Sequence, residues 1–206
     1  MITIIDYGLG NLGSVKNALD KLGIVSVVSN SPGEIKSSDG IILPGVGAAG
    51  EGMKNLKNTK LDNIIKQEIK KGKPILGICL GMQLLMSMSE EGKVICLDVI
   101  DGQVKKFEGN LKVPQIGWNT VQAANQCHLF KNIPQNSYYY FVHSYYCSVR
   151  NKTYEIGTTE YGLQFCSVVQ KDNIFGVQFH PEKSGENGLK LLKNFINIVY
   201  ENNTSD

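Results

Sequence analysis

Residues 73–84 read Lys73-Pro-Ile-Leu-Gly77-Ile-Cys79-Leu-Gly81-Met-Gln83-Leu84. An apolar run leads directly into a cysteine between two glycines, and a Met/Leu-rich segment follows. This order predicts a strand, a sharp turn and a helix, with the Cys79 thiol held out at the turn. The glycines allow the strand and the helix to pack closely, and the helix N-terminus favours the thiolate over the thiol. The stretch therefore predicts a nucleophilic cysteine.

The segments around this stretch alternate between strand-like and helix-like patterns. Runs of β-branched or apolar residues predict strands at 2–5, 24–28, 40–43 and 73–78. Apolar residues spaced three or four apart predict helices at 11–22, 61–71 and 82–88. This alternation predicts an α/β fold with a mainly parallel central sheet flanked by helices.

The second half of the chain has a different pattern. Short β-like runs, separated by glycine, asparagine and proline, occur at 138–142, 155–159, 165–169 and 174–179. They predict antiparallel strands added to the parallel core. A helix with one apolar face is expected at 188–200, and the polar tail 201–206 is expected to fray. Because there is no repeat or linker, residues 1–206 are expected to form a single domain.

Composition and charge argue against several kinds of partner. The chain is 42% hydrophobic and 19% charged, as is ordinary for a globular protein. Its net charge of +2 gives no reason to expect nucleic acid or an anionic membrane as a binding partner. No apolar run could span a bilayer, and the start, Met1-Ile-Thr-Ile-Ile-Asp6, lacks the basic region of a signal peptide. The five cysteines contain no C-x-x-C pair, which argues against a disulfide framework or a zinc site. We expect a cytoplasmic protein without a metal.

A motif near the start suggests a different function. Gly8-Leu-Gly-Asn-Leu-Gly13 has the G-x-G-x-x-G spacing of a dinucleotide-binding turn. That fold also needs a carboxylate after the second strand to hold the ribose, and here the strand ends in Val28-Ser-Asn-Ser31. A glycine-rich strand-to-helix turn is therefore the favoured interpretation, with Asp6, Tyr7 and Asn11 able to face a partner or ligand.

A partner for Cys79 occurs far downstream. His180 ends a strongly apolar run and precedes a proline, which favours a sharp exit with the ring in a cleft at the sheet end. Glu182 follows two positions later, where its carboxylate could fix the imidazole tautomer and stabilise the protonated ring. His128 lies in a polar stretch and is expected at the surface. Cys79, His180 and Glu182 together predict a thiol acyl-transfer enzyme.

Acyl transfer also requires hydrogen-bond donors for an oxyanion. The backbone N–H of Leu80, next to the nucleophile, is one natural donor. Pro44-Gly45-Val46-Gly47 should end a strand beside the Cys79 strand, and its glycines would let a peptide group turn inward as a second donor. We therefore predict the oxyanion donors at Leu80 and in the loop Gly45, Val46 and Gly47.

These segments together resemble the class I, or triad, glutamine amidotransferases. The shared segments are Leu43-Pro-Gly-Val-Gly47, Gly77-Ile-Cys-Leu-Gly-Met-Gln83 and Val177-Gln-Phe-His-Pro-Glu182. Other segments are similar to the glutaminase subunits of imidazole glycerol phosphate synthases, which act in histidine biosynthesis. They are Asp6-Tyr-Gly-Leu-Gly-Asn11, Gly117-Trp-Asn119, Tyr140-Phe-Val-His-Ser-Tyr-Tyr146 and Lys183-Ser184. The resemblance extends from residue 1 to about residue 200.

The resemblance implies a role for each matching residue. Cys79 would be the nucleophile, His180 the general base and acid, and Glu182 the residue that orients His180. The residues implied in the glutamine pocket are Gly47, Gln83, Ser144 and Tyr145, the last two through their backbone. The residues implied to face a (β/α)8-barrel partner, around an ammonia passage, are Asn11, Trp118, Tyr140 and Lys183. No metal or organic cofactor is implied.

Two positions depart from the family pattern. Gln115 stands where a histidine usually precedes the Gly117-Trp-Asn119 segment, and Ala49 lies in the segment where an aromatic residue usually follows the Gly45–Gly47 loop. Neither position belongs to the triad. Both are expected to concern the partner rather than the chemistry.

The expected function is hydrolysis of glutamine to glutamate, with the ammonia passed to a cyclase subunit that makes imidazole glycerol phosphate and an aminoimidazole by-product (AICAR). Three alternatives stay open at the level of sequence. The chain could feed ammonia to a different synthase, such as one that amidinates a surface sugar. It could be a thiol hydrolase that acts alone on an ester or a peptide. It could also be a regulatory module with a relic triad.

Overall fold

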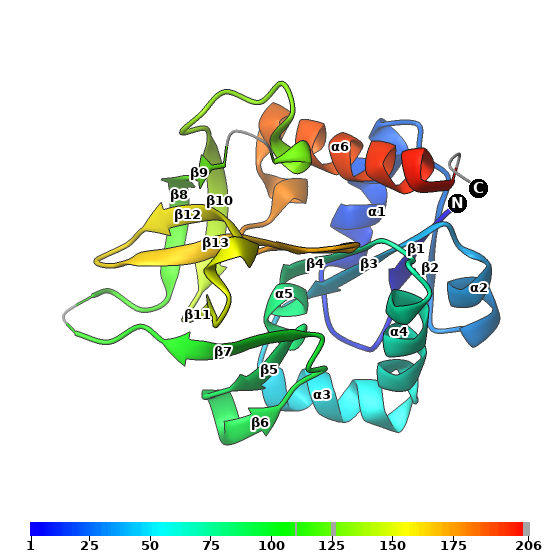
Figure 1. Ribbon diagram of the computed structural model, residues 1–206, viewed down its shortest axis with the longest axis horizontal. Helices are drawn as coiled ribbons and strands as arrows, with labels where there is room; N and C mark the ends of the chain where they lie inside the picture. Colours follow the sequence, from blue (N-terminus) through cyan, green and yellow to red (C-terminus); the bar gives the residue numbers. More distant parts are fainter. Residues whose placement is uncertain (110, 125–126, 204–206) are drawn as a thin grey trace.

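The computed structural model of the chain describes residues 1–109, 111–124 and 127–203 (Figure 1). Within these ranges the main sheet has twelve strands, in the order β2-β1-β3-β4-β14-β13-β11-β7-β5-β6, and β12 pairs with β13 and β9 beside this path. Its strands are β1 (Ile2–Ile5), β2 (Ser26–Ser29), β3 (Gly40–Gly45), β4 (Ile75–Cys79), β5 (Met86–Ser89), β6 (Val94–Ile95), β7 (Ile100–Lys106), β9 (Gln122–Ala123), β11 (Tyr145–Val149), β12 (Glu155–Glu160), β13 (Gln164–Lys171) and β14 (Ile174–Val177). A separate antiparallel pair consists of β8 (Gln115–Thr120) and β10 (Tyr138–His143).

The strands that carry the site are parallel. β1 pairs with β2 and β3, β3 pairs with β4, and β4 pairs with β14, all in parallel. β13, β11 and β7 then extend the sheet in antiparallel pairs. The predicted α/β fold with antiparallel additions is confirmed. β14 differs from what its position in the second half of the chain suggests, because it lies inside the parallel core.

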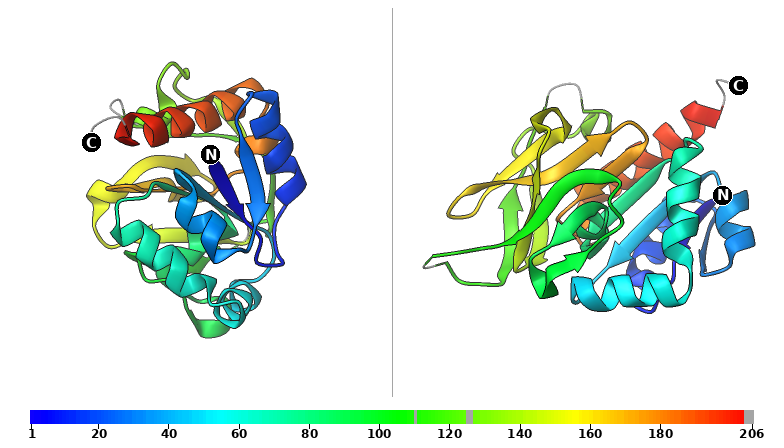
Figure 2. Two further views of the ribbon diagram at one scale, coloured as in Figure 1. Left: turned by 90° about the vertical axis from the view of Figure 1, so that its right-hand side faces the viewer. Right: turned by 60° about the horizontal axis from the view of Figure 1, so that its bottom comes forward.

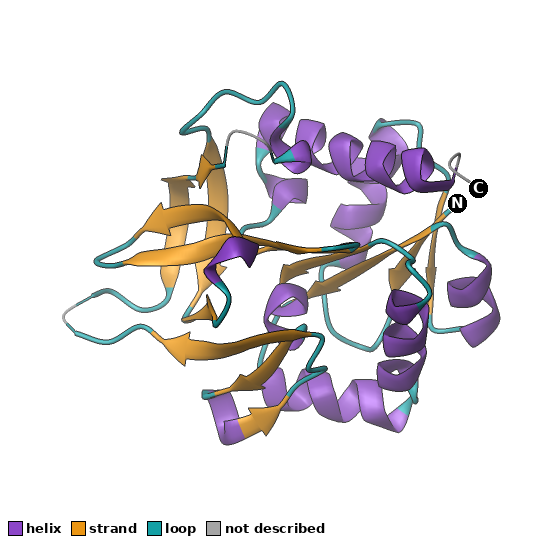
Figure 3. Ribbon diagram, in the orientation of Figure 1, coloured by secondary structure: helices purple, strands orange, loops and turns teal. Residues whose placement is uncertain are grey.

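Helices cover both faces of the parallel strands (Figure 2). They are α1 (Leu12–Lys21), α2 (Pro32–Ser37), α3 (Ala49–Asn58), α4 (Leu61–Lys70), α5 (Leu80–Leu84) and α6 (Gly185–Asn203), with 3-10 turns η1 (Glu91–Lys93), η2 (His128–Phe130), η3 (Lys152–Tyr154) and η4 (Pro181–Lys183). Alternate residues of β3 face opposite ways: Ile42 packs with α1 and α6, whereas Ile41 and Leu43 pack with α2 to α5. Figure 3 shows the helices gathered around the parallel strands and mainly strands and loops elsewhere. Among the helices of the described ranges, none has both the length and the apolar character that a membrane span needs.

Two helix boundaries differ from the sequence prediction. The helix expected at 82–88 is only the five-residue α5, and Met86–Ser89 forms strand β5 instead. Met86 pairs with Ile100 of β7, and Met88 pairs with Ile95 of β6, so strand pairing overrides the local helical pattern. At the other end of the chain α6 begins at Gly185 and continues through Asn203, so residues 201–203 extend the helix. Residues 204–206 of the expected frayed tail lie outside the described residues.

Close approach of α5 to the sheet depends on two glycines. A Cβ on Gly81 would lie 1.7 Å from the Leu43 carbonyl oxygen, and a Cβ on Gly77 would lie 2.7 Å from the backbone nitrogen of Met82. Both obstacles are backbone atoms, which cannot rotate away as a side chain can. The glycines around Cys79 therefore permit the tight strand-to-helix packing that the sequence predicts.

We predict that Gly81→Ala lowers the free energy of unfolding by about 3 kcal/mol, because the added methyl group overpacks the α5–β3 contact. Thermal or urea unfolding measures the change. Gly13→Ala is the matched control, since within the described residues a Cβ on Gly13 meets no atom within 4 Å and helix α1 tolerates alanine. The control should change stability by less than about 1 kcal/mol. Equal effects of the two substitutions would contradict the packing argument.

Candidate active site

Cys79 is the last residue of β4 and immediately precedes α5. Its backbone has φ +54° and ψ −110°, a region that a residue with a side chain rarely adopts and that costs on the order of 1–3 kcal/mol. The side chain is buried except for 6% of its surface. The strand, turn and helix around it have the form of a nucleophile elbow.

His180 reaches the same edge of the sheet by way of β14. β14 runs parallel to β4, with Val177 paired to Ile78, so the segment after β14 leaves the sheet beside Cys79. His180 Nδ1 lies 2.9 Å from Glu182 Oε1, and both side chains are almost fully buried. Because Nδ1 faces Glu182, the other ring nitrogen, Nε2, is the one that can hydrogen-bond to the Cys79 thiol. The structure therefore brings together the three residues of the predicted triad.

The environment of His180 stabilises the charged ring. Burial by itself would lower its pKa, but hydrogen bonds to Cys79 and Glu182 and the charges of both groups raise the pKa to about 10. At neutral pH the ring therefore holds a proton next to the sulfur. A protonated imidazole beside a thiol favours the thiolate, which is the nucleophilic form.

A cavity of about 310 Å³ opens over the triad. Cys79 and His180 both line it, and six of the predicted oxyanion and substrate residues do so as well: Val46, Gly47, Leu80, Gln83, Ser144 and Tyr145. Gly45 does not line the cavity; it is buried at the end of β3, in register with Cys79. Gly47 has φ +102°, which glycine adopts without strain, so the loop beside the sulfur has the backbone freedom that an oxyanion donor needs.

Three functional candidates in this region escaped the sequence prediction. Glu91 lines the cavity and also accepts a 2.8 Å hydrogen bond from the backbone N–H of Ala49. Gln178 is buried, and its Nε2 lies 3.7 Å from Cys79 Sγ. His143 is buried at the end of β10. A signal was available for Gln178, because alternate residues of an extended segment face the same way as His180; nothing local marks Glu91.

Of the residues expected at a partner interface, Lys183 lines the catalytic cavity and Tyr140 is bonded to the triad segment. Trp118 and Tyr140 are paired across β8 and β10 with ring centroids 5.9 Å apart, and Trp118 is 55% exposed. Tyr140 is tied to the triad segment, because its carbonyl oxygen accepts from the His180 N–H at 2.9 Å. Lys183 is exposed and lines the catalytic cavity. Asn11 follows β1 at the same edge of the sheet, just before α1.

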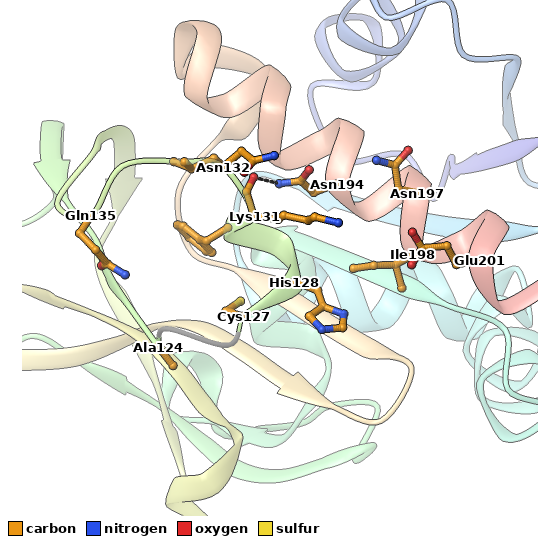
Figure 4. Close-up of a pocket in the computed structure, with 12 residues that line it drawn as sticks. Ala124, Cys127, His128, Lys131, Asn132, Gln135, Asn194, Asn197, Ile198 and Glu201 are labelled. Atoms are coloured by element: carbon orange, nitrogen blue, oxygen red, sulfur yellow. Dashed lines mark hydrogen bonds between the residues drawn. The ribbon is translucent and has the colours of Figure 1, made fainter.

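A larger cavity, of about 700 Å³, lies elsewhere, between α6 and the segment around η2 (Figure 4). It also has a cysteine and a histidine, Cys127 and His128, but they do not form a catalytic pair. Burial raises the pKa of the Cys127 thiol, which keeps it protonated, and His128 is exposed, as predicted. Asn194 of α6 donates to the carbonyl oxygens of Leu129 and Lys131, so this region anchors η2 to the helix. The described residues contain no group of three His, Cys, Asp or Glu side chains that could hold a metal ion.

Known proteins are similar to this chain in sequence. A family model for class I glutamine amidotransferases matches residues 3–199. Imidazole glycerol phosphate synthase subunit HisH of Moorella thermoacetica is 51% identical over 199 residues, which cover 96% of this chain and 95% of that protein. The subunit of the same name from Chlorobaculum tepidum is 50% identical over 198 residues, covering 95% and 98%.

A solved structure extends the comparison to the fold. A putative GMP synthase subunit from Thermoplasma acidophilum superposes with a TM-score of 0.75 at 20% identity, over 100% of this chain and 97% of that chain. At this low identity the likeness concerns the fold alone. The family match, the half-identical relatives and the assembled Cys79–His180–Glu182 geometry agree, and the chain belongs to the class I glutamine amidotransferases.

Proposed function

We propose that this chain is the glutaminase subunit of an imidazole glycerol phosphate synthase, acting in histidine biosynthesis. The observation that carries the proposal is the elbow cysteine facing the buried His180–Glu182 pair in one cavity. Relatives about half identical over nearly their whole length bear the name of that synthase subunit, which supports this enzyme over other members of the family.

The reaction follows from the triad. The Cys79 thiolate attacks the side-chain carboxamide carbon of glutamine, and N–H groups of Leu80 and the Gly47 loop stabilise the oxyanion. His180 gives its proton to the departing nitrogen, so ammonia leaves and a glutamyl thioester remains. The neutral ring then takes a proton from water, which attacks the thioester and releases glutamate. Glu182 holds the Nδ1 side of the ring through both steps.

The cavity also offers a site for the amino-acid end of the substrate. Among the residues that line it within the described ranges, Glu91 is the one carboxylate, so we assign it to the α-ammonium group. Ser144 and Tyr145, where β10 passes into β11, also line the cavity, and we assign their backbone groups to the same end of the substrate. Ammonium recognition by Glu91 would place the carboxamide toward Cys79.

The partner in this proposal is a (β/α)8-barrel cyclase, and both subunits would act in the cytoplasm. Trp118, Tyr140, Lys183 and Asn11 would face the barrel and surround the ammonia passage. Exposed apolar side chains beside them, Ile116 and Tyr138, support an interface here, because large apolar groups are costly to leave in water.

Reconstitution tests the proposal. The chain is mixed with the histidine-pathway cyclase of its own organism, and glutamate and imidazole glycerol phosphate are measured. We expect glutamine hydrolysis to rise at least about tenfold on binding, as the backbone at Gly47 becomes oriented toward the oxyanion. We expect Trp118→Ala to weaken binding about tenfold. Tyr200→Ala, which alters an aromatic residue 40% exposed on α6, is the control and should bind normally. Absence of a complex, or full hydrolysis by the chain alone, would contradict the proposal.

A further inference from the structure

A buried hydrogen-bonded pair lies at the wall of the substrate cavity, and one of its members, His143, lines the cavity. Gln115 of β8 and His143 of β10 are register partners, and Gln115 Oε1 lies 2.9 Å from His143 Nε2. The other ring nitrogen, Nδ1, lies 2.7 Å from the carbonyl oxygen of Tyr145. The position that departs from the family pattern, Gln115, is therefore turned inward against a histidine.

The same carbonyl belongs to a chain of contacts that ends at the nucleophile. Gln83 Nε2 donates to the Tyr145 oxygen at 3.0 Å and approaches Gln178 Oε1 at 3.1 Å. Gln178 Nε2 in turn lies 3.7 Å from Cys79 Sγ. The Tyr145 carbonyl thus accepts two hydrogen bonds from side chains that come from opposite sides of the site.

The surroundings of His143 define its protonation state. Three aromatic rings, Phe107, Phe141 and Phe165, lie with their centroids 5.3 to 5.6 Å from the imidazole. Burial, together with the charge of His180, lowers the pKa of His143 to about 4, although its bond to Tyr145 acts in the opposite direction. The ring is therefore neutral at physiological pH.

A neutral ring has one donor and one acceptor. Only Nδ1–H can donate to the Tyr145 carbonyl, so Nε2 carries the lone pair and must accept from the Gln115 NH2 group. A half-turn of the Gln115 amide exchanges its oxygen and nitrogen and brings the NH2 group to Nε2. The Tyr145 carbonyl therefore sets the Nδ1–H tautomer, and Gln115 satisfies Nε2 and holds the ring in place.

We propose that Gln115 and His143 are a positioning pair that fixes the Ser144–Tyr145 connection in the conformation that binds the amino-acid end of the substrate. The proposal rests on the proposed glutaminase function. It follows from location, since His143, Ser144 and Tyr145 line the cavity whereas Gln115 does not. Both ring nitrogens of His143 are engaged by Tyr145 and Gln115, so the pair acts on affinity through the Tyr145 backbone rather than on the chemical step.

The test replaces Gln115 by methionine, which keeps the length and volume of the side chain but offers no N–H. We expect Gln115→Met to raise the KM for glutamine about tenfold while kcat stays within about threefold of wild type. Gln115→His retains an N–H donor and should restore KM to within about twofold. Gln122→Met, at an exposed position of β9, is the matched control and should leave both constants unchanged.

Nitrogen NMR of the His143 ring gives a second readout that does not depend on activity. The wild-type ring should show the Nδ1–H tautomer with Nε2 hydrogen-bonded, and Gln115→Met should lose the hydrogen bond to Nε2. An unchanged KM, an equal loss of kcat with KM constant, or an Nε2–H tautomer in the wild type would overturn the proposal. If the wild-type complex hydrolyses no glutamine, the proposed function fails, whereas the tautomer measurement still decides whether the pair exists.

Discussion

Replacing Cys79 by alanine should abolish glutamine hydrolysis by the complex with its cyclase, with a loss of at least about 1,000-fold in kcat. The thiolate forms the covalent bond to the substrate, and no other thiol reaches the cavity, since the other four cysteines are buried elsewhere in the described chain. The variant complex should still make imidazole glycerol phosphate from added ammonium salt, because the partner receives ammonia without the thioester step. Glutamate release and product formation are measured side by side.

Cys127→Ala is the control for this experiment. It removes a buried thiol from the other cavity, near α6, and should leave glutamine hydrolysis close to wild type. Loss of the ammonium-dependent reaction in Cys79→Ala would mean that the substitution disrupts the complex instead of the chemistry. Normal hydrolysis by Cys79→Ala would refute the assignment of the nucleophile.

Replacing Glu182 by glutamine should lower kcat for glutamine hydrolysis by about 100- to 10,000-fold. Contacts with Cys79 and with Glu182 raise the ring pKa to about 10, and the carboxylate accepts from His180 Nδ1, so loss of the carboxylate should lower that pKa while the Cys79 contribution remains. The variant ring would also lose the acceptor that orients it toward the sulfur and the departing nitrogen. NMR titration of the ring measures the pKa, and steady-state kinetics measures kcat.

Glu182→Gln should also alter the pH dependence of the free energy of unfolding. A histidine whose pKa is raised on folding contributes stability that is fully present below about pH 6.5 and is lost as the pH rises through about 10. Wild-type stability should therefore decline across this window because of His180, and Glu182→Gln should flatten the decline. Glu186→Gln, an exposed change in the first turn of α6, should leave the slope intact. A slope that is identical in wild type and Glu182→Gln would contradict the coupling.

The fold could be predicted where local pattern and tertiary environment agree. Helices α1 and α4 have apolar residues at helical spacing, and each buries that stripe against the sheet. Met86–Ser89 shows the opposite case. Its composition suits a helix, but pairing with β6 and β7 makes it a strand, and the helical pattern of one segment does not reveal its pairing with another.

The candidate site shows the same division. Cys79 is marked by its flanking glycines, and His180 and Glu182 by an apolar run that ends in a proline turn. His143 carries no comparable mark, and Gln178 is marked only by its alternation with His180; Gln115 and His143 matter through the hydrogen bond between them, and Gln178 through its contact with Cys79. Polar residues of this kind become recognisable only when their burial is known.

The sequence by itself determined the chemistry of this protein. A cysteine at a strand-to-helix turn and a histidine with a carboxylate two positions later have few uses other than acyl transfer, since side-chain type sets the reaction. The tertiary structure alone decided how the parts meet: parallel pairing of β14 with β4 carries His180 to the sulfur, and the β8–β10 pair sets Gln115 against His143. Strand pairing depends on contacts between segments far apart in the chain, and local pattern does not encode those contacts.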